Sequence, residues 1–305
     1  MQIINISKGG VESGVEGAVV AIGNFDGVHL GHQAIIRMVQ EEAKRRKAPA
    51  GIITFDPSPY AFFKTQENFQ LTTLTQKAKI LKGMGLDFVA CADFNEELSK
   101  TSAADFVKNI LVGKLKVAHV FTGTDFRFGH KAQGNSELLG KMAKELGFNY
   151  TAIENILGPE GQKYRSSVVR NFLMEGKIKE AEEIMGRSFE IEGEVIKGAQ
   201  RGREIGFPTA NVDMGHYFLP KFGVYEVVVS IQNSEFKGVA NIGVKPTVSG
   251  DNKPLLEVHI PNFSDDIYGK TISVKLLSFV RKEMKFQGIE ELREQIRKDV
   301  GTIER

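Results

Sequence analysis

Two histidines separated by two residues stand in a glycine-rich segment, Gly23-Asn24-Phe25-Asp26-Gly27-Val28-His29-Leu30-Gly31-His32. An apolar run precedes the segment and a helical pattern follows it, so it joins a strand to a helix. Glycines let a backbone approach a polyphosphate, and a helix N-terminus offers unpaired N–H groups and a partial positive charge. Both imidazoles fall on one face of the first helical turn, where they can stabilise charge on a leaving pyrophosphate.

The spacing in this segment differs from the two common phosphate-binding motifs. No Gly-Lys-Ser/Thr follows, as a Walker loop requires, and the glycines do not have the dinucleotide spacing Gly-x-Gly-x-x-Gly. A lone histidine would more often cap or pack, but the pair inside this frame favours phosphate. We therefore predict ATP contacts from the glycine segment, with these residues: Gly23, Asn24, Phe25, Asp26, Gly27, His29, Gly31 and His32.

A second candidate phosphate site lies further along, at Gly198-Ala199-Gln200-Arg201-Gly202-Arg203-Glu204-Ile205-Gly206-Phe207-Pro208-Thr209-Ala210-Asn211. Arg201 and Arg203 flank Gly202, which suits a loop that closes over phosphate. Thr209 and Asn211 project to one side of an extended chain and can ligate Mg²⁺ beside phosphate oxygens. On these residues alone, a strand end after a solvated turn is an equally good interpretation.

The first segment resembles the HxGH motif of the nucleotidylyltransferase superfamily, in the form found in bacterial FAD synthetases. Asp56-Pro57-Ser58-Pro59 is similar to a family turn that usually has histidine at the position of Ser58. Gly123-Thr124-Asp125-Phe126-Arg127-Phe128-Gly129 resembles the flavin-side loop. This resemblance implies functional roles for Asp125, Phe126 and Phe128. A turn-forming role for Asp125 and core positions for both phenylalanines stay open.

A third segment of that family matches loosely at Arg165-Ser166-Ser167-Val168-Val169-Arg170, which resembles Ser-Ser-Thr-x-Ile-Arg. The resemblance implies that Ser166, Ser167 and Arg170 contact ATP phosphates. Arg165 stands where the family has serine, and Lys163 where arginine is common. These departures predict altered affinity for ATP rather than lost activity.

The second candidate site resembles the PTAN motif of riboflavin kinases, and the similarity continues to residue 286. This resemblance implies that ATP binds at Gly198, Arg201, Gly202, Arg203 and Thr209. It also implies that Thr209 and Asn211 hold Mg²⁺ and that Arg281 and Phe286 contact flavin. A riboflavin hydroxyl holds its proton about as tightly as water does, so its phosphorylation benefits from a base. The family assigns that role to the position of Glu257, which could otherwise be a solvent-facing strand residue.

The order of the two resemblances matches bacterial bifunctional FAD synthetases. It implies ATP- and Mg²⁺-dependent phosphorylation of riboflavin to FMN, followed by adenylylation of FMN to FAD. The phosphate of FMN is already an anion, so the second reaction needs positioning and charge neutralisation rather than a base. Three alternatives stay open: a kinase with a weakened or vestigial adenylyltransferase, a flavin-binding regulator without turnover, and an adenylylating enzyme for RNA or another cofactor.

The elements that position the first site alternate between strands and helices. We predict strands at residues 19–22, 51–55, 87–90, 117–121 and 150–153. Helices are predicted at 30–47, at 75–83, from the N-cap Ser102 to 111, and from the N-cap Ser136 to Gly147. Repeated β-then-α order predicts a Rossmann-like parallel sheet with helices on both faces. Ligands of such sheets bind at the carboxyl ends of the strands, near the reversal of strand order.

The pattern of apolar residues changes after a helical stretch at residues 168–185. Short β-like runs separated by Gly, Pro and Asn fill residues 189–286 and predict a small antiparallel barrel, which a helix at 289–300 closes. The fold class is therefore α/β followed by a barrel, with domains 1–186 for adenylylation and 187–305 for the kinase.

Composition limits the classes of partner. Of the 305 residues, 41% are hydrophobic and 26% charged, and the net charge of +2 argues against nucleic acid and against a polybasic membrane anchor. The only cysteine, Cys91, lies in an apolar run and is expected to be buried and inert. Without a leader pattern or an apolar stretch of membrane length, we expect a cytoplasmic protein, monomeric or weakly homo-oligomeric.

Overall fold

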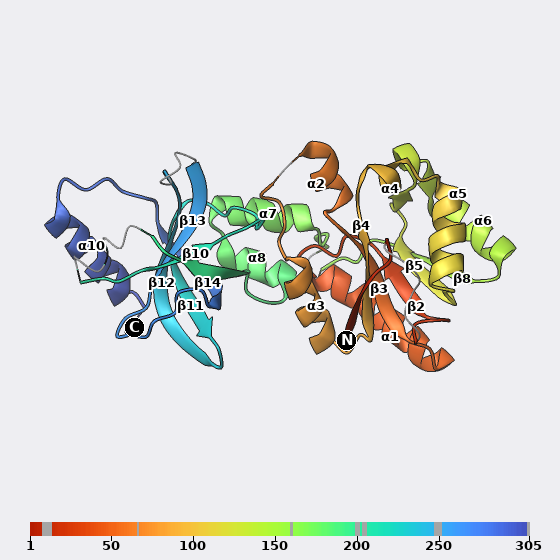
Figure 1. Cartoon of the computed structure of the whole chain (residues 1–305), viewed down its shortest axis with the longest axis horizontal. Helices are drawn as coiled ribbons and strands as arrows, with labels where there is room; N and C mark the ends of the chain where they lie inside the picture. The colour runs from red at the N-terminus through yellow and green to blue at the C-terminus, as the bar shows by residue number, and fades with distance from the viewer. Residues whose placement is uncertain are drawn as a thin grey trace. The chain divides into compact units, whose positions relative to one another are not determined.

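The computed structural model describes residues 1–7, 14–65, 67–158, 161–198, 202, 206–246 and 252–303. They form two compact units (Figure 1). The first consists of Met1–Glu67 and Thr73–Arg165, and the second of Asn68–Thr72 and Ser166–Arg305. In the described part of the chain, no helix is long and apolar enough to span a membrane.

The first unit is built on a six-stranded sheet in which all the paired strands are parallel, in the order β1-β4-β3-β2-β5-β8. Its elements, in chain order, are β1 (Gln2–Asn5), β2 (Val19–Ile22), α1 (Leu30–Arg46), β3 (Ala50–Asp56), α2 (Pro59–Lys64), α3 (Leu74–Gly83), β4 (Phe88–Asp93), α4 (Glu96–Lys100), α5 (Ala103–Asp105), the π-helix η1 (Phe106–Lys114), β5 (His119–Gly123), β6 (Arg127–Phe128), the 3-10 turn η2 (His130–Ala132), β7 (Gly134–Asn135), α6 (Ser136–Leu146) and β8 (Asn149–Ile153).

The strand order reverses beside β2. The chain runs from β2 through β3 to β4 on one side, and then returns to add β5 and β8 on the other. The segment with both histidines follows β2, so it lies at the reversal, where ligands of open parallel sheets bind. The predicted parallel sheet is confirmed, whereas the short edge strand β1, which pairs with β4, was not predicted.

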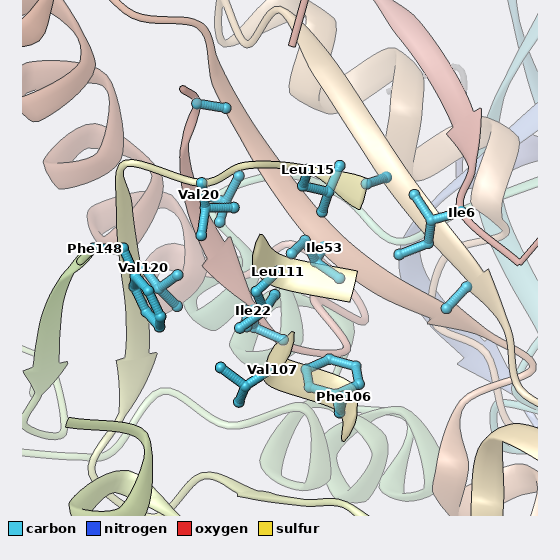
Figure 2. Packing of buried hydrophobic residues seen from close by; sticks show 14 of the residues in the cluster. Ile6, Val20, Ile22, Ile53, Phe106, Val107, Leu111, Leu115, Val120 and Phe148 are labelled. Carbon is cyan, nitrogen blue, oxygen red and sulfur yellow. The ribbon is translucent and has the colours of Figure 1, made fainter. Parts of the chain in front are cut away.

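Alternate residues of β2 face opposite sides of the sheet. Val19 and Ala21 belong to one buried cluster, which includes Ile36 and Val39 of α1 and Leu81 of α3. Val20 and Ile22 belong to the other cluster (Figure 2), together with Val107 and Leu111 of η1, Val120 of β5, and Phe148, which precedes β8. Burial on both faces explains why β2 is apolar at every position.

Three helix predictions need correction. Ser102 does cap a helix, but α5 ends after one turn and continues as η1. Asn135, not Ser136, caps α6: its side-chain oxygen accepts a hydrogen bond from the Leu138 N–H at 2.8 Å. The stretch at 168–185 is two helices, α7 (Ser166–Glu175) and α8 (Ile178–Met185), since Gly176 between them has a φ of 77°.

The second unit contains the predicted barrel, closed by six antiparallel strands in the order β10-β13-β12-β11-β14-β9. Its further elements are β9 (Glu190–Ile196), β10 (Ala210–Asp213), β11 (Gly223–Ile231), β12 (Ser234–Pro246), β13 (Asn252–His259), β14 (Thr271–Arg281) and α10 (Ile289–Gly301). After α10, Ile303 is buried against Val224 and Val239 of the barrel. Helices α7 and α8 belong to the same compact unit as the barrel, and the main segment of that unit begins at Ser166. The boundary between the two functions at residue 186 remains a prediction.

Candidate active sites

The histidine pair is held at the start of α1. His29 is the N-cap, and its Nδ1 accepts a hydrogen bond from the His32 N–H at 3.3 Å. The two imidazole rings stack, with centroids 3.6 Å apart and planes 16° apart. The prediction that both histidines share one face of the first turn is confirmed. Because Nδ1 of His29 is an acceptor, the neutral ring carries its proton on Nε2 and can donate it to an anion.

The backbone around the pair has little freedom. A Cβ at Gly31 would lie 2.9 Å from the Cβ of Tyr164 and 3.3 Å from the His29 ring, so only glycine fits there. Phe25 and Val28 are buried, and both have positive φ, 46° and 39°. Such strain in bulky residues persists only where the surroundings impose it, and it is common at functional sites.

Burial controls the charge of the pair. It lowers the pKa of His32 well below the ordinary histidine value, and the nearby His29 and Lys77 lower that pKa further. His32 is therefore neutral at pH 7. Its Nδ1 is buried and has no hydrogen-bond partner in the described chain. A neutral imidazole with such an Nδ1 is free to form a hydrogen bond with a bound phosphate.

Lys77 of α3 is a residue that sequence reasoning missed. Its ammonium group is buried and donates to the backbone oxygen of Asn24 at 2.7 Å. The only signal in the sequence is its spacing, four residues before the buried Leu81, which places a lysine on the core-facing side of a helix.

An aromatic cavity of about 250 Å³ lies elsewhere in the first unit. Its rings come from segments far apart in the sequence: Phe55, Phe63, Phe94, Phe106, Phe126 and Phe128. Phe126 and Phe128 stack with their centroids 5.4 Å apart. Phe128 lines this cavity and is also part of the buried core. The other four rings were not predicted, because their segments show no shared pattern.

Asp125 is exposed and does not line this cavity. Its carboxylate forms no hydrogen bond to the described residues, so it does not stabilise a turn in that way. Ser58 caps α2, where its hydroxyl accepts a hydrogen bond from the Ala61 N–H at 3.3 Å. Cys91 is buried as expected, and burial raises the pKa of its thiol to about 12.

The third predicted segment of the adenylylation site falls in the second unit. Ser166 begins α7 and Ser167 is exposed. Arg170 is buried: its Nε donates to the Phe69 backbone oxygen at 3.1 Å, and its guanidinium lies 3.6 Å from the centre of the Phe69 ring. The guanidinium of Arg170 therefore has structural contacts of its own. Lys163 and Arg165 are exposed.

In the barrel, a cavity of about 280 Å³ brings together residues from four of the predicted positions: Thr209, Glu257, Arg281 and Phe286. Glu257 lies on β13, where its register partners are Asn211 of β10 and Asn241 of β12. It lines a cavity rather than facing only solvent. Residues of α10 form part of the same wall: Leu292, Ile296 and Asp299.

Two glycines, Gly198 and Gly202, pack against the predicted metal pair of Thr209 and Asn211. A Cβ at Gly198 would lie 2.2 Å from Asn211 Nδ2, and one at Gly202 would lie 3.3 Å from the Thr209 hydroxyl. Glycine at both positions therefore lets the backbone pass close to the side chains of Asn211 and Thr209, where any larger residue would collide. Arg201 and Arg203, predicted to close over phosphate, lie outside the described residues. In the described chain there is no cluster of three or more His, Cys, Asp or Glu side chains that could hold a metal.

Arg281 is fixed by an ion pair inside the cavity. Its Nε and terminal nitrogen bind both carboxylate oxygens of Asp299, at 3.0 and 2.7 Å, and Asp299 is 4% exposed. Gln295 donates to the same carboxylate at 2.9 Å. Glu283 accepts a hydrogen bond from Asn241 at 3.1 Å on the cavity wall. Sequence reasoning missed Asp299, whose only signal is an acidic residue on the core side of an amphipathic helix.

A second barrel cavity of about 420 Å³ also includes Thr209. The residues that line it are mostly from the loop before β14 and from the start of β10: Pro208, Ala210, Phe263, Ser264, Asp265, Asp266, Ile267 and Tyr268. Thr209 therefore lies between two cavities, one with the glutamate and one without it.

Comparisons with known proteins agree across both units. A family model described as FAD synthetase matches residues 12–168, and one described as riboflavin kinase matches residues 185–305. Bifunctional riboflavin kinase/FMN adenylyltransferases from Buchnera aphidicola (strain Sg) and Escherichia coli (strain K12) are 38% and 39% identical to the chain. The alignments cover 94% of this chain and 93% and 92% of those proteins.

A solved structure from Streptococcus pneumoniae, described as a macrolide-efflux protein, shares the fold. Its TM-score is 0.84 at 27% sequence identity, and the match covers 100% of this chain and 98% of that one. The description concerns that protein, and the likeness here is one of architecture.

Proposed function

Because the chain belongs to the family of bifunctional riboflavin kinase/FMN adenylyltransferases, we propose how its two units divide the two reactions and which residues serve each. The protein phosphorylates riboflavin to FMN with ATP and adenylylates FMN to FAD, releasing pyrophosphate. We assign adenylylation to residues 1–186 and the kinase to residues 187–305. The alternative of a vestigial adenylyltransferase has no support from the relatives.

The kinase assignment rests on one observation: a single cavity contains both a carboxylate and the predicted flavin contacts. Riboflavin occupies this cavity against Phe286, with its terminal hydroxyl toward Glu257. Glu257 accepts the hydroxyl proton as the oxygen attacks the γ-phosphorus of ATP, whose bond to the bridging oxygen breaks to release ADP. ATP lies in the neighbouring cavity, so that Thr209 is between the two substrates.

Magnesium fits the Thr209 and Asn211 pair. Neutral oxygen ligands next to glycine backbone suit a hard cation that takes its other ligands from phosphate and water. When bound, the ion neutralises charge on the phosphates of ATP. Arg201 and Arg203 remain proposed phosphate contacts, together with Gly198 and Gly202.

The adenylylation assignment places the ATP phosphates at the segment from Gly23 to His32 and the flavin ring in the phenylalanine cavity. FMN attacks the α-phosphorus as an anion, so no base is required. The neutral His32 and the Nε2–H of His29 donate hydrogen bonds as negative charge grows on the departing pyrophosphate. Ser166, Ser167 and Arg170 are further proposed phosphate contacts, and Asp125 remains a proposed residue of the flavin side.

The test is a product assay with the full chain. Riboflavin, ATP and Mg²⁺ should give FMN first and FAD afterwards, and FMN supplied directly should give FAD with one pyrophosphate per FAD. FMN accumulation without FAD would contradict the adenylylation half. We also propose a cytoplasmic location, where ATP is supplied, and a monomer or weak homo-oligomer.

A further inference from the structure

The Lys77 side chain ends beneath the segment from Gly23 to His32. It is 6% exposed, and its Nζ donates to the Asn24 backbone oxygen at 2.7 Å and to the Thr54 hydroxyl at 3.2 Å. Thr54 is fully buried and donates its own hydroxyl to the same Asn24 oxygen at 3.1 Å. Two side chains from α3 and β3 thus converge on one carbonyl of the loop.

The direction of that carbonyl fixes the direction of the next N–H. The C=O and N–H of a trans peptide point in opposite directions. With the Asn24 carbonyl held toward Lys77, the N–H of Phe25 points away from the interior. Among the described residues, this N–H has no hydrogen-bond acceptor. Phe25 has a φ of 46°, and outward N–H groups in such turns form anion-binding concavities.

Filling the space that Lys77 occupies does not require a charged side chain. Burial lowers its pKa, while the carboxylates of Asp26 and Asp56 act in the opposite direction. Asp26 belongs to the loop itself, and Asp56 begins the turn Asp56-Pro57-Ser58-Pro59. A buried cation costs several kcal/mol unless it is well paired, so a methionine would fill this space at a lower cost. A lysine here is explained by the carbonyl that it binds.

We infer that Lys77 is a positioning residue for FAD formation: it holds the Asn24 carbonyl inward so that the Phe25 N–H faces the phosphates of ATP. The inference rests on the proposed position of ATP at this segment. Lys77 itself touches neither substrate. It acts through one peptide group, and Thr54 supports it.

Three variants of the full chain test the inference. Lys77→Met keeps the length of the side chain and removes the donor. Thr54→Val removes one hydroxyl with almost no change in volume. Lys82→Met is the matched control, because Lys82 is exposed on the same helix. FMN-to-FAD kinetics are measured with ATP and FMN varied separately, and riboflavin-to-FMN kinetics are measured on the same samples.

We expect kcat/KM for ATP in FAD formation to fall about 100-fold in Lys77→Met and about tenfold in Thr54→Val, the range found when reacting groups are misplaced. The KM for FMN should stay within about twofold, because no residue of the Gly23–His32 segment lines the phenylalanine cavity. The riboflavin kinase rate and the Lys82→Met variant should match the wild type.

Two results would overturn the inference. The first is a kcat/KM for ATP in Lys77→Met that equals the wild-type value, whatever the melting temperature of the variant. The second is a decrease of kcat/KM in that variant that is equally large for ATP and for FMN. If Lys77→Met does not fold, Thr54→Val decides, and unchanged ATP kinetics there would refute the role. Failure of the proposed function is distinguishable, because His29→Ala would then also leave FAD formation intact.

Discussion

The two units place their candidate catalytic groups by different means. In the first unit, His29 and His32 lie in and after a loop, held by strained backbone at Phe25 and Val28 and by the missing side chain at Gly31. In the barrel, Glu257 lies on a strand between Asn211 and Asn241, its register partners on either side. One site depends on the conformation of a loop, the other on a hydrogen-bonded ladder.

The proposed chemistry of the two sites accounts for this difference. An alcohol must lose a tightly held proton as it attacks, so the kinase needs a carboxylate at a fixed point in a cavity. An FMN phosphate needs no base, and adenylylation depends on donors aimed at developing charge. Backbone N–H groups and imidazoles at a helix N-terminus supply such donors. The contrast implies that single substitutions should separate the two activities.

Replacing the carboxylate should produce the largest effect. In Glu257→Gln we expect riboflavin phosphorylation to fall about 10³-fold, since a general base contributes roughly 10²–10⁴. FMN-to-FAD conversion should be unchanged. Separate assays from riboflavin and from FMN measure this, and a loss of both activities in a folded protein would break the two-site comparison.

Removing the imidazoles should produce the opposite pattern. His29→Ala and His32→Ala should each lower kcat for FAD formation about 100-fold, as the loss of a donor to developing charge does in other enzymes. Phosphorylation of riboflavin should continue at its normal rate. If kinase activity fell in parallel, the histidines would support the whole fold rather than one reaction.

Breaking the ion pair on the cavity wall should have an intermediate effect. Asp299→Asn leaves the Arg281 guanidinium without its buried counter-charge, and we expect roughly 3 kcal/mol lower stability of the barrel. The KM for riboflavin should rise about tenfold, because Arg281 and α10 shape the cavity. Denaturant unfolding and riboflavin titrations measure the two effects. Glu290→Gln, at an exposed position of α10, is the control.

Acidification should produce the smallest effect, confined to the first unit. The pKa of His32 is lowered mainly by burial, so between that pKa and about 6.5 the unfolded chain binds a proton that the folded unit does not. Stability should therefore decrease as pH falls below about 6.5, by at most about 1.4 kcal/mol per pH unit for this group. Burial also lowers the pKa of His119, which therefore changes stability with pH in the same direction. His32→Gln should reduce the slope of unfolding free energy against pH, and an unchanged slope would show that His32 is not the group responsible.

Sequence patterns predicted the features that depend on neighbours along the chain. The parallel sheet, the barrel, the terminal helix and the stacked histidine pair all follow from period, spacing and local geometry. The errors occurred where local signals compete. Ser136 and Asn135 are both good caps, but the Ser136 hydroxyl donates to the backbone oxygens of Gly123 and Thr124, and Asn135 caps the helix.

Contacts between distant segments could not be predicted in the same way. Lys77 binds the carbonyl of a residue 53 positions earlier, and its sequence neighbours do not indicate that partner. The rings of the phenylalanine cavity come from several elements, each with an ordinary apolar pattern. Asp299 resembles any acidic residue on an amphipathic helix until the fold brings it to Arg281.

The sequence alone therefore determined the two architectures and the position of residue types that suit the two proposed phosphate chemistries, because glycine spacing, strand period and helix capping act over a few residues. Tertiary structure alone decided which buried charges support those residues and where an aromatic cavity forms. The physical reason is that burial and ion pairing depend on what the rest of the chain places around a side chain.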